Sequence, residues 1–221
     1  MKNNANGARR LAVALTALGA ATLGLPALAG GELIKQGETT YNTYCSACHQ
    51  PGGTGKEGVA PSLNSPEFLA MASDDFLHTT IGTGRPGTAM VAWDATLGKD
   101  KIDAVIAYLR SLYGNDAGSL ATTVNAEPPA KGDPAVGAER YKNICSGCHA
   151  DQGGGYLAGG SAPAIGKPGF LKVASDGYIR QTVRYGRSNT RMRGFQGPTG
   201  LANLSDKEID DIISYLRSLN R

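Results

Sequence analysis

Two short clusters of cysteine and histidine are the residues of this chain best suited to chemistry. The pattern C-x-x-C-H occurs at Cys45–His49 and again at Cys145–His149, and it uses all four cysteines and two of the three histidines. Two thiols at this spacing can add to the two vinyl groups of one porphyrin, while the imidazole that follows points at the iron. We therefore predict two covalently attached haem c groups. The predicted thioether residues are Cys45, Cys48, Cys145 and Cys148, and the predicted proximal iron ligands are His49 and His149.

A disulfide or a zinc site is the alternative interpretation of these cysteines. A disulfide within each motif would leave the adjacent histidine without a role, and a zinc site that draws on both motifs would have to join positions a whole domain apart. Both alternatives are weaker than haem attachment because the pentapeptide recurs intact.

The sixth iron ligand decides whether such a haem carries electrons or binds a substrate. The candidates are Met71, Met90, Met192 and His78. Only Met90 and Met192 occupy equivalent positions after the two motifs, so we predict that both ligate iron and close the distal face. The alternative is that they fill gaps in the core, as most methionines do.

A proline follows each motif, Pro61 in one case and Pro163 in the other. A backbone carbonyl at this position could accept a hydrogen bond from Nδ1 of the proximal histidine and so orient its ring. The alternative is an ordinary loop proline.

An internal repeat determines the predicted architecture. Matching residues precede and follow the two motifs, and their offset rises only from 100 to 107 residues along the chain. Gly37-x-x-x-Tyr41 matches Gly137-x-x-x-Tyr141, and both copies end in the sequence Y-L-R-S-L. We predict an all-α protein of two tandem domains, each wrapped around one haem, at residues 30–113 and 135–221, joined by a linker at residues 114–134.

Helical periodicity supports this class. Apolar residues in the last helix of each copy recur on one face, over residues 102–112 and 209–219. Ser73 and Ser175 are predicted N-caps of a shorter helix, and Ser205 with Glu208 forms a predicted capping box. Because a domain of this size has a thin core, we expect the chain without haem to be unfolded or molten.

The N-terminus is typical of an export signal. A basic start precedes a long apolar run and the A-x-A pattern Ala27-Leu28-Ala29. We predict a signal peptide at residues 1–29, cleaved near Ala29, and a periplasmic protein. The alternative is an uncleaved inner-membrane anchor that faces the periplasm.

Charge is distributed unevenly. Residues 30–130 carry six Lys and Arg against eleven Asp and Glu, a net −5, whereas residues 131–221 carry thirteen against eight, a net +5. The basic excess includes five arginines close together near the second motif: Arg180, Arg184, Arg187, Arg191 and Arg193. They are interpreted as a docking face for an acidic redox partner, with an oxyanion site or pairing with haem propionates as alternatives. Nothing in the composition resembles a nucleic-acid binder.

Taken together, these motifs resemble the class I cytochromes c. The match includes G-x-x-x-Y, C-x-x-C-H, the following proline, the distal methionine, and Tyr108 or Tyr215 on the last helix. The resemblance implies that the first and last helices cross, with the glycine allowing close approach. The stretch Gly84–Trp93 is similar to the methionine loops of haem domains attached to respiratory oxidases and dehydrogenases, whereas the second loop lacks the proline and flanks Met192 with arginines.

The predicted function is electron transfer through two His/Met-ligated haems, without catalysis. The donor and acceptor would be redox proteins, including a membrane-bound oxidase, dehydrogenase or quinol-oxidising complex. The alternatives are a diheme enzyme, such as a peroxidase or a sulfur-oxyanion oxidising enzyme, and a haem subunit held in a larger respiratory or dehydrogenase complex. An enzyme would need an open iron position.

Overall fold

Helices make up all the regular structure of the chain over residues 25–220, the range that the computed structural model describes. In that range there are a few isolated bridges but no β-strand. In chain order the elements are α1 (Leu25–Tyr44), α2 (Ser46–His49), η1 (Pro51–Gly53), α3 (Pro66–Met71), α4 (Asp74–Thr83), α5 (Asp94–Ser111), η2 (Gly114–Asp116), α6 (Ala121–Asn125), α7 (Pro134–Ile144), α8 (Ser146–His149), η3 (Asp151–Gly153), η4 (Tyr156–Ala158), α9 (Pro168–Leu171), α10 (Asp176–Tyr185) and α11 (Asp206–Ser218). The predicted all-α class is confirmed.

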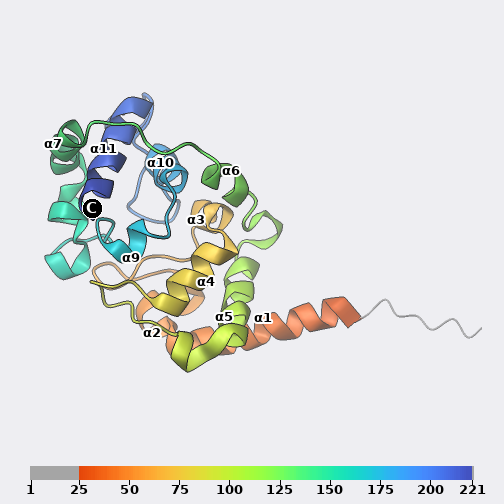
Figure 1. Ribbon diagram of the computed structural model, residues 1–221. Coiled ribbons are helices and arrows are strands. Elements are labelled where there is room, and N and C mark those ends of the chain that lie inside the picture. Colours follow the sequence, from red (N-terminus) through yellow and green to blue (C-terminus); the bar gives the residue numbers. More distant parts are fainter. Residues whose placement is uncertain (1–24, 221) are drawn as a thin grey trace, which may run out of the picture.

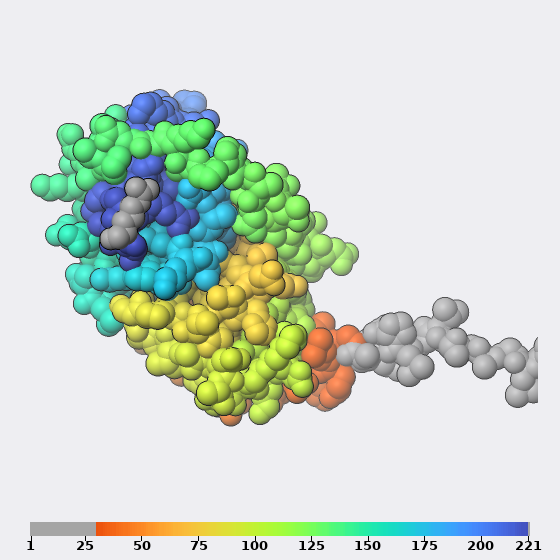
Figure 2. Space-filling model, viewed as in Figure 1, coloured from red at the N-terminus to blue at the C-terminus, as the bar shows by residue number. Residues whose placement is uncertain are grey.

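The order of these elements repeats. Helices α1 to α5 recur as α7 to α11, with α6 between the two series, and the two copies lie against each other (Figure 1). In the space-filling view the copies meet along a continuous boundary (Figure 2).

The first and last helices of each copy cross at a glycine. A Cβ on Gly37 would lie 1.9 Å from the carbonyl oxygen of Ala104, and a Cβ on Gly137 would lie 1.9 Å from that of Asp211. Tyr41 packs beside the first crossing against Tyr108, with ring centroids 5.2 Å apart. Tyr141 and Tyr215 repeat this contact at 5.3 Å. The close approach that the resemblance implied is therefore present in both copies.

The helix caps predicted from the sequence are also present. The hydroxyl of Ser73 accepts a hydrogen bond from the Phe76 amide at 3.0 Å, and Ser175 caps α10 in the same way. Ser205 and Glu208 form the predicted capping box at the start of α11. Each cap satisfies amide groups that would otherwise lack partners at a helix N-terminus.

The segment between the copies is more ordered than a flexible linker. It contains η2 and α6, and α6 buries Ala121 and Val124. The amide of Gly118 donates to the carbonyl of Leu69 in the first copy at 2.7 Å. Further along, the amide of Asp133 donates to the carboxylate of Asp211 in the second copy at 2.7 Å. The segment therefore forms hydrogen bonds with both copies.

The predicted export signal falls largely outside the described residues, which begin at Leu25, the first residue given for α1. The first turns of α1 extend away from the body of the molecule (Figure 1). Among the helices of residues 25–220, none combines the length and the apolar character needed to cross a bilayer.

Candidate functional site: two equivalent haem-attachment motifs

Each C-x-x-C-H motif forms a tight helical turn directly after the first helix of its copy. The amide of His49 donates to the carbonyl of Cys45 at 2.9 Å, and the amide of His149 donates to that of Cys145 at the same distance. The next residue has a positive φ in both copies, 64° at Gln50 and 59° at Ala150, which ends the turn. The carbonyls of these two residues each accept a tyrosine hydroxyl at 2.8 Å, from Tyr41 and Tyr141 respectively.

The imidazole of each motif is oriented by a backbone carbonyl. Nδ1 of His49 lies 2.9 Å from the carbonyl oxygen of Pro61, and Nδ1 of His149 lies 2.8 Å from that of Pro163. Because a carbonyl only accepts, Nδ1 carries the proton and Nε2 keeps a free lone pair. Burial lowers the pKa of His49 and of His149, which favours the neutral imidazole that binds a metal.

The four cysteines are free thiols in the structure, so they form no disulfide. Burial, reinforced by the second thiol of each motif, raises the pKa of Cys45 to about 11 and that of Cys145 to about 12. Zinc binds the thiolate form, which a raised pKa disfavours at neutral pH. The described residues contain no cluster of three His, Cys, Asp or Glu side chains suited to a metal ion.

The two methionine loops are built by the same hydrogen bonds despite their different sequences. The amide of Arg85 donates to the carbonyl of Met90 at 2.8 Å, and the amide of Arg187 donates to that of Met192 at 2.7 Å. Within each loop a threonine hydroxyl bridges the arginine carbonyl and the methionine amide, Thr88 in the first copy and Thr190 in the second. This threonine, two residues before each methionine, is a shared feature of the two loops that the sequence analysis did not identify.

The remaining candidates for the sixth ligand lie elsewhere. Met71 is buried in the hydrophobic core, where only 4% of its surface is exposed. His78 lies on α4, and its Nε2 is 3.7 Å from the carboxylate of Asp103 on α5. Neither residue has a counterpart of the same type in the second copy.

The residues present fit haem c at both motifs. Each motif offers two free thiols and an imidazole with a free Nε2, and each copy presents a methionine on an equivalent loop. Moreover, the buried Nε of Arg187 has no hydrogen-bond partner among the described residues, as expected if an anionic group belongs beside it.

Most of the predicted arginine docking face is engaged within the chain. Arg180 is 5% exposed and pairs with Glu127 and Asp210, a geometry that does not suit a docking residue. The other arginines with ion-pair partners are Arg184, which pairs with Asp206, and Arg191, which pairs with Glu57 of the first copy. Arg187 stacks between aromatic rings, and only Arg193 is both exposed and without an ion-pair partner in residues 25–220. Arg180, Arg184 and Arg191 are engaged because the linker, α11 and the first copy contribute carboxylates that pair with them.

The sequence does not predict the contact between the two copies. Equivalent residues of α4 and α10, Phe76 and Tyr178, stack on each other with centroids 5.0 Å apart. On either side, Arg85 lies over Phe170 and Arg187 lies over Phe68, both with Cζ 5.1 Å from the ring centroid. Because each contact is matched by its exchanged equivalent, the copies are related by a local two-fold axis.

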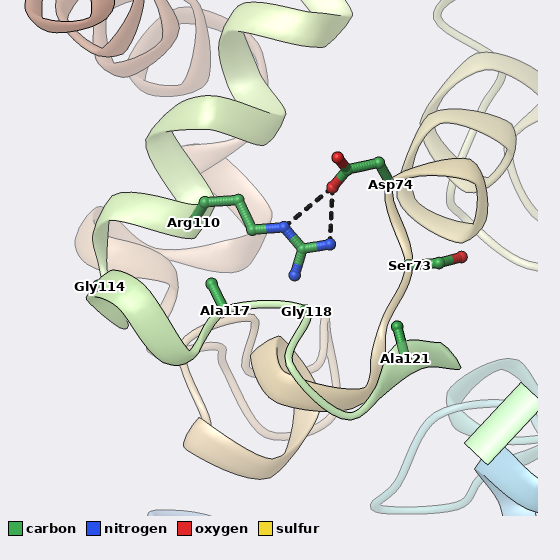
Figure 3. A pocket seen from close by; sticks show the side chains of 7 residues that line it. All are labelled: Ser73, Asp74, Arg110, Gly114, Ala117, Gly118 and Ala121. Atoms are coloured by element: carbon green, nitrogen blue, oxygen red, sulfur yellow. Dashed lines mark hydrogen bonds and ion pairs between the residues drawn. The ribbon is translucent and has the colours of Figure 1, made fainter. Parts of the chain in front are cut away.

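A shallow pocket lies apart from both motifs, where the linker meets α4 and α5 (Figure 3). Its charged lining residues already bind each other, since the guanidinium of Arg110 donates to the carboxylate of Asp74 at 2.7 Å. Arg217 and Asp176 form the equivalent ion pair in the second copy. The pocket is therefore part of the repeated scaffold.

Comparison with known proteins agrees with the repeat. A family described as "Cytochrome C oxidase, cbb3-type, subunit III" matches residues 32–109 and again residues 132–216. The chain is 29% identical over 205 residues to the cbb3-type cytochrome c oxidase subunit CcoP of Azospirillum sp. (strain B510), covering 86% of this chain and 63% of that protein.

Two further relatives differ from each other in how much of their length this chain covers. Cytochrome c4 of Thiocapsa roseopersicina is 26% identical, with 84% of this chain and 92% of that protein covered. The cytochrome c subunit of alcohol dehydrogenase (quinone) from Gluconobacter oxydans is 27% identical, with 87% of this chain and 47% of that protein covered. The chain thus spans less than two thirds of the oxidase and dehydrogenase subunits that it resembles.

Proposed function

Because the chain belongs to the family of cbb3-type cytochrome c oxidase subunit III, with two tandem c-type cytochrome domains, we propose that it transfers electrons between redox partners through two covalently bound haem c groups. The proposed haem domains are residues 30–113 and 135–221. The single observation that carries this proposal is the duplicated site, with the same motif, the same histidine–proline hydrogen bond and the same methionine loop in each copy.

The residues of each site have distinct proposed roles. When bound, haem supplies a one-electron couple between Fe(II) and Fe(III). The cysteines would hold the group through thioethers, and the histidine would supply a ligand to its iron. The carbonyl of Pro61 or Pro163 fixes the tautomer and the orientation of that imidazole. Met90 and Met192 would each supply a second protein ligand to the iron and so exclude exogenous ligands.

Two closed sites favour a carrier over an enzyme. A peroxidase or a sulfur-oxyanion oxidising enzyme would need an iron position that a substrate can enter. Both methionine loops have the same hydrogen bonds, which gives no reason to propose that one of them is open.

The partner is proposed to be a membrane-bound oxidase, dehydrogenase or quinol-oxidising complex. Relatives named as subunits of a cbb3-type oxidase and of a quinone-dependent alcohol dehydrogenase support this class. A stable haem subunit of such a complex is the second candidate, because those relatives are named as subunits of an oxidase and of a dehydrogenase. We further propose export to the periplasm with cleavage near Ala29, which N-terminal sequencing of the purified protein tests.

Haem content tests the proposal directly. The protein is produced in cells that attach haem c, and its intact mass is measured after acidic extraction of non-covalent haem. We expect the mass of the chain plus two haems, and two reversible one-electron couples in a redox titration. The double variant Cys145→Ala/Cys148→Ala is expected to keep one haem and one couple. A chain that retains no haem after extraction would refute the assignment.

A further inference from the structure

The two methionine loops, residues 85–90 and 187–192, each contact the opposite copy at equivalent positions. In the second loop Ser188 contacts Glu67, the second residue of α3, and in the first loop Pro86 contacts Gly169, the second residue of α9. Pro86 and Ser188 each lie four residues before the methionine of their loop. Glu67 and Gly169 each follow the proline that begins their helix. The two contacts are therefore equivalent under the local two-fold axis.

These equivalent contacts have different chemistry. Ser188 donates from its amide to Oε2 of Glu67 at 2.8 Å and from its hydroxyl to Oε1. Pro86 has no amide hydrogen to donate, and Gly169 has no carboxylate to accept one. These two residues pack closely instead, since a Cβ on Gly169 would lie 2.8 Å from Cδ of Pro86 and 2.7 Å from Cα of Arg85. Hydrogen bonds to a carboxylate hold the second loop, whereas backbone packing holds the first.

The carboxylate of Glu67 is also fixed within its own copy. Ser65, which is fully buried, caps α3 by accepting a hydrogen bond from the amide of Phe68 at 3.3 Å. The same hydroxyl donates to Oε2 of Glu67 at 3.1 Å. Hydrogen bonds to an ionised acceptor are stronger than those between neutral groups. Glu67 is therefore held at the boundary in a position to accept from the second loop.

The second loop has more need of a contact from outside than the first. Its Asn189 has a φ of 61°, a left-handed conformation that a residue with a Cβ adopts at a cost, whereas the equivalent Gly87 has a φ of 83° without that cost. Pro86 in the first loop also fixes its own φ, which Ser188 does not. Because the hydrogen bonds within the two loops are the same, the contact with Glu67 is what offsets the difference.

We propose that Glu67 is a positioning residue for the second iron site, which acts from the first copy by holding the second methionine loop closed and so keeping Met192 in place as a ligand. The inference rests on the proposed function, because it takes Met192 as the sixth ligand. The first site does not depend on a hydrogen bond of this kind, since its loop contains Pro86 and packs on Gly169. The second site is therefore the first to open when the two copies separate.

Glu67→Gln in the holoprotein with both haems attached tests the proposal, because it keeps the size of the side chain and removes its charge. We expect the opening equilibrium of the second loop to shift by about ten-fold, a factor equivalent to about 1.4 kcal/mol and within the contribution of a hydrogen bond to a charged group. Carbon monoxide added to the reduced variant should then bind at the second haem alone. Hydrogen–deuterium exchange of the peptide that spans residues 187–192 should become faster. A variant that excludes carbon monoxide as the wild type does would overturn the proposal.

Double variants show which site opens. Glu67→Gln/Met192→Ala is expected to bind carbon monoxide at one haem, as Met192→Ala does alone, because both changes act on the same ligand. Glu67→Gln/Met90→Ala is expected to bind it at both haems. A merely structural role of Glu67 would lower the free energy of unfolding without this dependence on the site. Binding at both haems in Glu67→Gln/Met192→Ala would mean that both loops had loosened, and would overturn the proposal.

Two further variants serve as a matched control and a rescue. Glu57→Gln removes a carboxylate that forms an exposed ion pair with Arg191 of the same loop, and both haems are expected to stay closed. Glu67→Gly/Ser188→Pro copies the residues of the first contact into the second, and it is expected to bind less carbon monoxide than Glu67→Gly. Equal opening in Glu57→Gln and Glu67→Gln, or a double variant as open as Glu67→Gly, would overturn the proposal.

Failure of this inference can be told apart from failure of the proposed function. If the wild-type protein carries two haems that exclude carbon monoxide, and Glu67→Gln excludes it equally, the role of Glu67 alone is refuted. A wild-type protein without covalent haem would instead refute the proposed function. Spectra of Met192→Ala that match those of the wild type would refute the ligand on which both depend.

Discussion

At the scale of single residues, the methionines separate into ligand candidates and core residues by their surroundings. Met90 and Met192 lie on loops with identical hydrogen bonds, whereas Met71 is enclosed by the core. We therefore expect replacement of a loop methionine to change iron ligation, and replacement of the core methionine to change only the stability of the fold.

The first prediction concerns Met192→Ala. We expect the second haem to lose its sixth ligand, so that its reduced form binds carbon monoxide while the first haem does not, and we expect the potential of the second haem to fall. Visible spectra before and after addition of carbon monoxide measure this. Met90→Ala is expected to give the reverse assignment.

Met71→Ala is the matched control for the methionine prediction. It removes a buried side chain and leaves a cavity, so we expect a loss of about 3 kcal/mol in the free energy of unfolding. The spectra of both haems should not change. Carbon monoxide binding by Met71→Ala, but not by the other two variants, would contradict the assignment of the ligands.

At the scale of helices, the packing of each copy depends on one glycine at the crossing of the first and last helices. Gly37 and Gly137 approach the carbonyls of Ala104 and Asp211 more closely than any side chain allows. The crossing in turn places the motif that follows the first helix beside the core.

The second prediction is that Gly37→Ala destabilises the first copy. Its methyl group would overlap the backbone of α5, at a cost of at least about 2 kcal/mol in the free energy of unfolding. Denaturant unfolding of the holoprotein measures the cost. Gly31→Ala lies on the same helix with no atom near the added methyl, and its stability is expected to stay equal or to rise by less than about 1 kcal/mol. Equal losses in both variants would contradict the proposed role of the crossing.

The sequence predicts an element where its residue pattern recurs in both copies or where the element is long enough to show an apolar period. The haem motifs and the helix caps follow from residue types that recur in register, whereas the crossing of the first and last helices is what the resemblance to class I cytochromes c implies. Helix α6 was not predicted because its five residues, Ala121–Asn125, are too short for an apolar period. Its position depends on contacts with α3 and α10, which are distant in sequence.

At the scale of the whole molecule, the two copies of the domain pack against each other. The uneven charge seen in the sequence serves partly to join them. Glu67 of the first copy accepts hydrogen bonds from the amide and the hydroxyl of Ser188, and Glu57 pairs with Arg191. The sequence predicts a docking face for the arginines but not their ion pairs, because no pattern within one copy reveals contacts between copies.

The third prediction is that the contact of Glu67 depends on pH. Burial alone would raise the pKa of Glu67, but hydrogen bonds from Ser188 and Ser65 outweigh it and hold the pKa below its usual range. A carboxyl group whose pKa is lower in the folded state stabilises that state above its unfolded pKa of about 4.3. This contribution is lost as the pH falls through the lower folded value.

Glu67→Gln tests this dependence. We expect it to lower the free energy of unfolding by about 1 kcal/mol at pH 7, and the difference from wild type to shrink as the pH falls below about 4. Glu57→Gln removes the same charge from an exposed ion pair at the same boundary and should cost less. A difference for Glu67→Gln that grows on acidification would contradict the account.

The most direct test of two closed electron-carrying sites is to add carbon monoxide to the dithionite-reduced wild-type holoprotein. We predict that the spectra of both haems stay unchanged, because Met90 and Met192 are the proposed sixth ligands. A shift at either haem would reveal an open or displaceable position, contradict the carrier assignment at that site, and direct attention to peroxide and sulfur oxyanions as substrates.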